Sequence, residues 1–170
     1  ILIALFIHFH LTHDRFHENY NRVYRIDRIV HLSDQTRRWG QTWFPVGRTL
    51  KENHAEIEQS AVTRPVWGEH FSVSGGETIY EHHGLYAENS IFDILSYEFI
   101  EGSPQNALNE TFSMVLSEKL ANKYFPDESA LGKIIRVRNK YDYRVTGVYR
   151  DLPEKTMLDD TDYISSMKSF

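Results

Sequence analysis

The chain has 170 residues, enough for one domain of ordinary size with a sizeable buried core. Its 24 acidic and 19 basic residues give a net charge of −5, which is not the basic character of a nucleic-acid-binding domain. Cysteine is absent, which excludes disulfides, cysteine nucleophiles and cysteine metal ligands.

The chain opens with seven apolar or small residues, Ile1 to Ile7, and turns strongly polar within a few residues. A transmembrane helix needs about 20 apolar residues, so this run alone is too short to span. We interpret residues 1–22 as the end of a transmembrane helix followed by a membrane-exit helix, with residues 1–11 in the membrane. One face of a continuing helix would carry Phe9, Phe16, Tyr20 and Val23.

Two other readings of this start are open. One is an ordinary apolar helix packed in a soluble core. A signal peptide is disfavoured because it would begin with a basic region and end in a small-residue cleavage site. Neither feature is present, since His8, Phe9 and His10 follow the apolar run.

A strand, a helix and a second strand are predicted next. Residues 23–32 are rich in β-branched side chains, which is typical of a strand, and the polar run 33–40 is a loop or hairpin tip. Pro45 suits the first turn of a helix over residues 44–53. A second strand over residues 59–66 would complete a βαβ-like unit.

Short strands dominate the middle of the chain. Segments 69–73 and 78–82 flank Gly75 and Gly76, which favours a hairpin, and residues 84–87 are extended. Asn89 or Ser90 is expected to cap a short helix over 91–95, and residues 101–104 are expected to form a turn.

The last third alternates strands with one helix. A strand over 111–116 leads to Ser117, which is expected to cap a helix over 118–125. Segments 133–138 and 141–150 form a predicted hairpin, and a final strand is expected over 162–167. The inner face of the helix would carry Leu120, Ala121, Tyr124 and Phe125.

The run from Ser113 to Pro153 resembles a known family. A helix that begins Ser-Glu-Lys-Leu-Ala at residue 117 is followed by Leu-Gly-Lys at 131–133, a hairpin, Tyr-Arg-Val-Thr-Gly-Val at 143–148 and Asp-Leu-Pro at 151–153. With Asp-Arg-Phe-His at 14–17, this series resembles the periplasmic core domain of MacB-like, FtsX-like ABC transporter permeases of the Bacteroidetes type. Residues 155–158 depart from the family, which often has a small polar pair there.

The resemblance implies an α+β fold in two parts. Residues 23–64 would be the first part of a porter-like βαβ subdomain, and residues 65–153 an inserted, β-rich, sabre-like subdomain. Residues 154–170 would begin the return to the porter-like part. This implies a fragment that is incomplete at its C-terminus, with the remainder lying beyond Phe170.

The implied function is that of a non-catalytic domain. It would couple ATP-driven movement of membrane helices to the export or extraction of a periplasmic or membrane cargo, on the periplasmic side of a bacterial inner membrane. The implied partners are a cytoplasmic ABC ATPase, a second permease copy or half, and a periplasmic adaptor or cargo. Gly132-Lys133 lacks the rest of a P-loop, so ATP would be hydrolysed outside this chain. The alternative is an extracytoplasmic sensor or ligand-binding module on a membrane anchor.

No catalytic or cofactor site is expected. His10, His13 and His17 recur at i, i+3 and i+7, a spacing that can hold Zn²⁺ on one helix face, as a small metalloenzyme would require. No carboxylate supplies a clear fourth ligand, so we expect no metal site. Residues 159–162 are acidic but lack the glycine and the final glutamate of a calcium loop.

Overall fold

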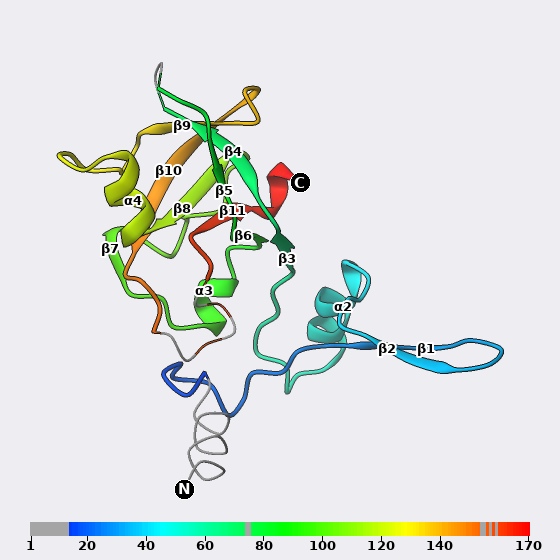
Figure 1. Cartoon of the computed structure of the whole chain (residues 1–170). Helices are drawn as coiled ribbons and strands as arrows, with labels where there is room; N and C mark the ends of the chain where they lie inside the picture. Colours follow the sequence, from blue (N-terminus) through cyan, green and yellow to red (C-terminus); the bar gives the residue numbers. More distant parts are fainter. Residues whose placement is uncertain (1–13, 74–75, 154–155, 157, 159) are drawn as a thin grey trace, which may run out of the picture.

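The computed structural model describes residues 14–73, 76–153, 156, 158 and 160–170, and Figure 1 shows their arrangement. The strands are β1 (Arg28–His31), β2 (Thr36–Trp39), β3 (Thr63–Val66), β4 (Glu69–Ser72), β5 (Ile79–Glu81), β6 (Gly84–Ala87), β7 (Phe99–Gly102), β8 (Ser113–Ser117), β9 (Ile134–Val137), β10 (Tyr141–Tyr149) and β11 (Tyr163–Ser166). The helices are α2 (Pro45–Asn53), α3 (Ile91–Ile94), α4 (Glu118–Tyr124) and the 3₁₀ turn η1 (Met167–Ser169).

A curled, mixed sheet of nine strands forms the body of the molecule. Eight strands follow the order β3-β6-β11-β8-β10-β9-β4-β5, and β7 pairs with β10 beside this path. The pairs β6–β11 and β8–β10 are parallel, whereas their neighbours are antiparallel. The sheet therefore joins segments from residue 63 to residue 166.

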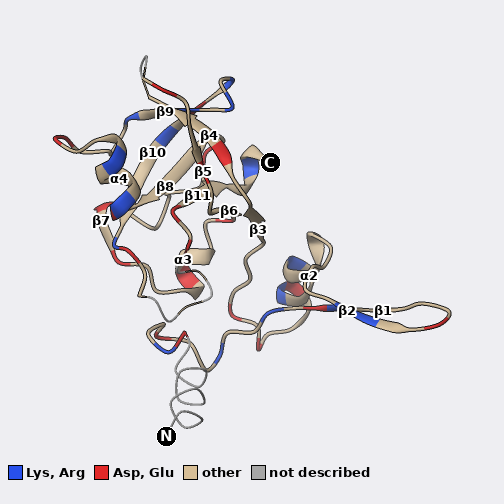
Figure 2. Ribbon diagram, in the orientation of Figure 1, with Lys and Arg blue, Asp and Glu red and all other residues tan. Residues whose placement is uncertain are grey.

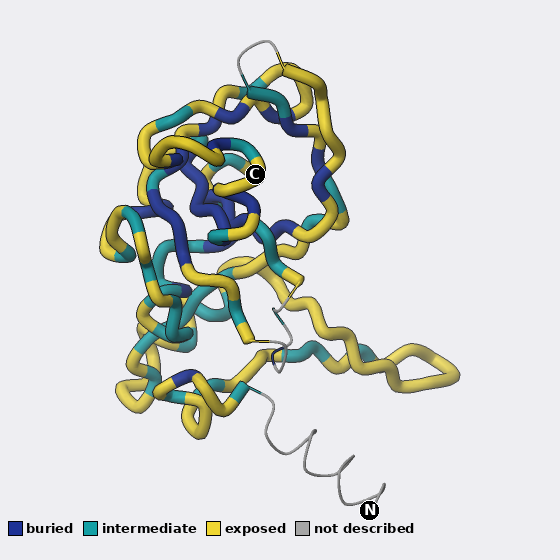
Figure 3. The backbone as a smooth tube through the Cα atoms, turned by 60° about the vertical axis from the view of Figure 1, so that its left-hand side comes forward, coloured by how far each residue is buried: buried dark blue, intermediate teal, exposed yellow. Residues whose placement is uncertain are grey.

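Strand β8 lies at the centre of the sheet, with both of its faces buried. Its five residues are all buried, which is typical of a strand covered on both sides. Met114 and Leu116 point into a core under α4, and Val115 points into a second core that includes Ile91 of α3. Burying one such side chain contributes about 1.5–3 kcal/mol. Figure 3 shows most of the buried residues gathered in the body of the molecule and the hairpin beside α2 without any.

Gly84 is required by a close approach between β6 and β11. It pairs with Tyr163, whose side chain is 2% exposed. A Cβ atom at residue 84 would lie 2.1 Å from Cζ of the Tyr163 ring. Only glycine fits at this position without moving the tyrosine.

A second, smaller unit lies apart from the nine-stranded sheet. Strands β1 and β2 form an antiparallel hairpin that extends away from the body beside α2 (Figure 1). None of the residues of α2 is buried. This unit therefore contributes little to the two apolar cores.

Most local predictions are confirmed. The helices over 44–53, 91–95 and 118–125, the two predicted hairpins and the last strand are present with small shifts at their ends. Ser117 caps α4 as expected, since its Oγ accepts a hydrogen bond from the Leu120 amide (3.1 Å). The expected α+β class is also confirmed, because helices and a mixed sheet share one core.

The predicted cap of α3 is wrong in its chemistry. Ser90 is the N-cap residue, but its side chain makes no capping bond and instead donates to the Ser60 carbonyl (2.7 Å). Asn89 bonds to the 104–108 loop, where its Oδ1 accepts from the Leu108 amide (2.8 Å). Tertiary partners have displaced the local cap at this short helix.

The predicted exit helix does not continue through residues 14–22, which form turns. Asp14 has a φ of 58°, which does not belong to a right-handed helix. The amides of His17, Tyr20 and Arg22 each bond to the carbonyl three residues earlier. The apolar periodicity was a poor guide here because side-chain and backbone groups of this segment bond to a distant loop. Residues 1–13, which include the predicted membrane contact, lie outside the described residues.

Two further differences concern the sheet. Strands β1 and β3 flank α2 in the predicted order, but they lie in different sheets and so do not form one βαβ layer. The turn expected over residues 101–104 begins later than expected, because Glu101 and Gly102 belong to strand β7 (Phe99–Gly102). Gly102 ends β7 with a φ of 76° and pairs with Gly147 of β10. The division of the chain into subdomains at residues 64 and 153 stays a prediction.

Candidate functional site

The candidate site is the junction through which residues 14–22 contact the sheet body, and the loop after α3 provides its other side. The Ser96 amide donates a hydrogen bond to Nδ1 of His17 (3.0 Å), and the Glu18 amide donates to Oγ of Ser96 (3.0 Å). The His17 side chain is 2% exposed, and its bond to the Ser96 amide is partly buried. We call residues 14–18, 95–97 and Thr156 the junction.

A second contact strengthens the junction from the other end of the chain. Oγ1 of Thr156, which is buried, donates to Oδ1 of Asp14 (2.5 Å). Asp14 and Thr156 are 142 residues apart in sequence. A third contact is the ion pair of Arg22 with Glu58 (2.8 Å). Both side chains are exposed, so this pair contributes little to the stability of the junction.

The protonation state of His17 follows from this geometry. Nδ1 accepts an N–H, so the bonded ring is neutral and carries its proton on Nε2. Burial lowers the pKa of His17, and the nearby carboxylate of Asp14 raises it by a smaller amount. The ring of Phe16 also lies against the imidazole, with centroids 3.9 Å apart.

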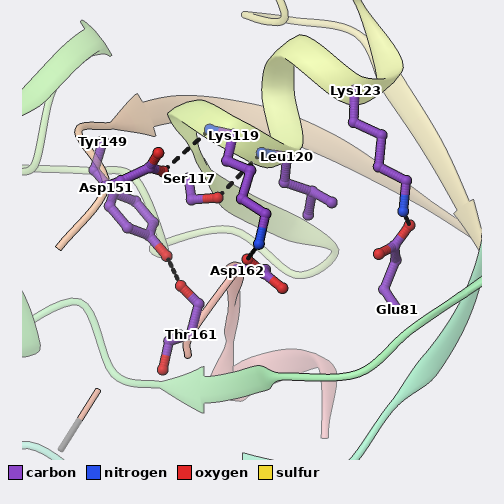
Figure 4. A network of polar contacts seen from close by, with 9 residues as sticks. All are labelled: Glu81, Ser117, Lys119, Leu120, Lys123, Tyr149, Asp151, Thr161 and Asp162. Carbon is purple, nitrogen blue, oxygen red and sulfur yellow. Dashed lines mark hydrogen bonds and ion pairs between the residues drawn. The ribbon is translucent and has the colours of Figure 1, made fainter. Parts of the chain in front are cut away.

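Polar contacts fix α4 against the sheet (Figure 4). Besides the cap from Ser117, Oδ1 of Asp151 accepts a hydrogen bond from the Lys119 amide (3.1 Å). Two of the free amides in the first turn are therefore satisfied. Tyr149, which is buried, donates from its hydroxyl to the Thr161 carbonyl (2.5 Å) and so holds the chain just before β11.

Two lysines one turn apart on α4 contact carboxylates of neighbouring segments. Lys119 lies 3.8 Å from Asp162, and Lys123 lies 2.7 Å from Glu81, whose side chain is buried. The Tyr124 hydroxyl also donates to Glu81, and burial together with this carboxylate raises the pKa of Tyr124. Burial raises the pKa of Asp162 as well, and Lys119 opposes this effect. These contacts tie α4 to β5 and β11 and include no activated nucleophile.

The hollows beside β10 are small or open. One of 170 Å³ contains the hydroxyls of Tyr86 and Tyr143, which lie 3.3 Å apart, and Arg138, which is bound on both sides of its fork by the buried carboxylate of Glu69. Ligand sites usually occupy about 300–1,000 Å³. A second hollow of 340 Å³ is open to solvent and lined partly by Arg144 and Thr146. Neither resembles an enclosed small-molecule site.

Large side chains are exposed on the hairpin unit. The exposed residues are Tyr24, Ile29, Trp39, Trp43 and Phe44. Trp39 pairs with Arg28, so Ile29 lies on the opposite side of the hairpin from Trp39. We call the surface that Trp39 and Trp43 form around Arg28 the aromatic face. The Arg28 guanidinium lies over both indole rings, 5.4 Å from the Trp39 centroid and 5.5 Å from the Trp43 centroid. Figure 2 shows basic residues along the same hairpin.

The structure places one of the three histidines considered as metal ligands. His10 and His13 lie outside the described residues, and His17 has its Nδ1 occupied by the Ser96 amide. Within the described part of the chain, no group of three His, Asp or Glu residues is arranged to hold a metal ion. The importance of Ser96 and Thr156 was missed, because nothing in the sequence near either residue points to a partner at residues 14–18.

No helix in the described ranges is long and apolar enough to cross a membrane.

Comparison with known proteins gives one family and a shared fold. The family model described as the MacB-like periplasmic core domain matches residues 2–170. A permease-protein domain from Porphyromonas gingivalis has a TM-score of 0.70 and 22% sequence identity, over 80% of this chain and 57% of that chain. The periplasmic region of MacB from Actinobacillus actinomycetemcomitans has a TM-score of 0.50 and 20% identity, over 65% of this chain and 49% of that chain. The chain thus spans about half the length of these relatives, and a search of curated proteins finds no match.

Proposed function

Because this chain belongs to the family of MacB-like periplasmic core domains, we propose that it couples movement of the membrane helices of an ABC transporter permease to the export or extraction of a cargo. The domain itself would be non-catalytic. A cytoplasmic ABC ATPase would hydrolyse ATP, and a second permease copy or half would complete the transporter. A periplasmic adaptor or the cargo would contact the outer surfaces of the domain.

The observation that carries this proposal is the junction. Residues 14–18 follow the apolar start of the chain and bond to the 95–97 loop through His17 and Ser96, and to Thr156 through Asp14. Two of these contacts involve buried side chains, so a displacement of residues 14–18 cannot leave the sheet body unaffected. Such contacts would give movement of a membrane helix before residue 14 a mechanical path into the domain, which supports the proposal.

The test is ATP-dependent hydrogen exchange in the full permease with its ATPase. With ATP and orthovanadate bound, we expect exchange to change in residues 14–22 and 95–97, while the buried amides of β8 keep their protection. An ATPase with its P-loop lysine replaced by alanine is the control, and it should abolish the change. Coupling through the junction is contradicted if exchange at both segments is the same with and without nucleotide.

We also propose that the hairpin unit belongs to a porter-like subdomain that a further part of the protein covers. Two observations support this: α2 is amphipathic yet buries none of its residues, and the solved relatives are longer than this chain. An apolar surface of this kind is usually covered by protein or another apolar partner. Residues 65–153 would form the sabre-like part and residues 154–170 would start the return.

Tryptophan fluorescence tests the covering of the aromatic face. The chain has three tryptophans, and Trp67 is 84% exposed and outside the hairpin unit. In a Trp67→Phe variant, emission from Trp39 and Trp43 should lie at shorter wavelength in a longer chain that includes the rest of the domain than in the 170-residue chain. The matched control retains Trp67 alone, through Trp39→Phe and Trp43→Phe, and should show no shift. Equal emission from both lengths of the Trp67→Phe variant would contradict the proposal.

A further inference from the structure

The imidazole of His17 holds two segments together by accepting a hydrogen bond. Its Nδ1 receives the Ser96 amide, and the His17 side chain is 2% exposed. The neighbouring bond from the Glu18 amide to Ser96 Oγ depends on the same placement of the two segments.

Protonation would reverse the role of Nδ1. An imidazolium has an N–H on both ring nitrogens, so Nδ1 would present a donor to the Ser96 donor. The two hydrogens would repel each other, and the Ser96 amide would lose its partner in a partly buried position. A donor that is withdrawn from water and has no partner is unfavourable, so protonation weakens the docked arrangement.

We infer that His17 is a proton-sensitive latch, which holds the N-terminal segment on the sheet body while neutral and releases it when protonated. The latch requires only the junction geometry. Its consequence for transport rests on the proposed coupling function.

The groups around the ring determine when the latch opens. In the described segments, the carboxylate of Asp14 is the charged group that acts on His17, and it favours the imidazolium. The 95–97 loop presents the Ser96 amide and Tyr97, whose phenol is kept neutral because burial raises its pKa. The burial of His17 outweighs Asp14, so docking favours the neutral ring. Release is therefore expected as the pH falls below the ordinary histidine value of 6.5.

Spin-label distances in the full permease test the latch. This chain contributes no cysteine, so Tyr20→Cys and Ile100→Cys, at two exposed positions, can carry the labels once cysteines elsewhere are replaced. At about pH 8 we expect one short distance, and at about pH 5 a second, longer population. The docked-to-released ratio should change by about tenfold for each pKa unit that separates the docked and released forms of His17.

Two variants separate proton sensing from simple packing. His17→Asn keeps an acceptor near the Nδ1 position but does not titrate, so the short distance should persist at both pH values. His17→Phe keeps a ring but has no acceptor, so the population with the longer distance should be present at both pH values. His70→Asn changes an exposed histidine on β4 and should leave the wild-type pH response intact.

A wild-type spin-label distance that does not change with pH would overturn the latch. The latch would also be overturned if the longer population appeared at low pH in His17→Asn to the same extent as in the wild type. Because these measurements use no nucleotide, they are independent of the ATP-dependent exchange experiment. A working latch with no nucleotide response would leave the latch standing and remove the coupling function. A nucleotide response without a pH-dependent distance would leave the coupling function standing and remove the latch.

Discussion

At the scale of single residues, Asp162 and Asp142 have pKa values shifted in opposite directions. Burial raises the pKa of Asp162, against a weaker effect from Lys119, whereas a hydrogen bond from Arg136 lowers the pKa of Asp142. The folded protein therefore binds a proton on Asp162 more tightly than the unfolded chain does, and on Asp142 less tightly. A rise in pH therefore lowers the contribution of Asp162 to stability and raises that of Asp142.

We predict that Asp162→Asn does not destabilise the protein at neutral pH. The contribution of Asp162 to stability is greatest in acid and falls as pH rises from 3.8 through its raised pKa, so an uncharged residue avoids this loss. The free energy of unfolding should increase by up to about 1 kcal/mol, because the site is partly solvated and the Lys119 contact is lost. Urea denaturation across this pH range is the measurement.

Asp142→Asn is the matched control for this series. The contribution of Asp142 is present above 3.8 and is lost as pH falls through its lowered pKa, so the variant should lose stability at neutral pH and little in strong acid. A drop in stability at neutral pH for Asp162→Asn would show that Lys119 matters more than burial at that site.

At the scale of elements, the parallel pair β6–β11 depends on a residue without a side chain. Gly84→Ala should destabilise the protein by about 3 kcal/mol, because the new methyl group would overlap the buried ring of Tyr163. Thermal unfolding monitored by near-ultraviolet circular dichroism would show both the lower Tm and any change around the tyrosine.

Gly47→Ala in α2 is the control at this scale. Its added methyl would lie 3.4 Å from Cβ of Ser60, an ordinary contact, and alanine favours a helix over glycine by about 0.5–1 kcal/mol. This variant should therefore be as stable as the original or more stable. If Gly84→Ala behaved in the same way, the close packing of β6 on β11 would be wrong.

The elements also show what sequence reasoning can and cannot reach. The helix after Ser117 and the hairpins were predictable because their signals are local: a capping residue, a glycine pair and a period-two pattern. The parallel pairs were not, since β8 and β10 meet across an intervening helix and strand. The junction could not be predicted for the same reason, because Ser96 lies 79 residues from His17 and no local sequence pattern marks it.

At the scale of the whole molecule, the nine-stranded sheet and the hairpin unit differ in how much of their apolar surface is buried. The sheet covers two apolar cores with α3 and α4, whereas the hairpin unit leaves the aromatic face exposed. The resemblance read from residues 113–153 lies within the sheet and was the correct guide to the family. Its subdomain boundaries are less easily read, because β3 (Thr63–Val66) crosses the boundary at residue 64 and β11 lies after residue 153, yet both join the same sheet as the strands between them.

The place of β11 also has a consequence for biosynthesis. It lies between β6 and β8, so among the described pairings it is the strand that joins the β3–β6 pair to the remaining strands. The preceding strands of this sheet leave the ribosome before Tyr163 does. Until then, the buried faces of β6 and β8 have no common neighbour, and sheets closed by such distant pairings form slowly. Newly made chains would therefore expose the buried residues of β6, which leave the ribosome before those of β8, until β11 is made, and this is the interval in which a chaperone is most useful.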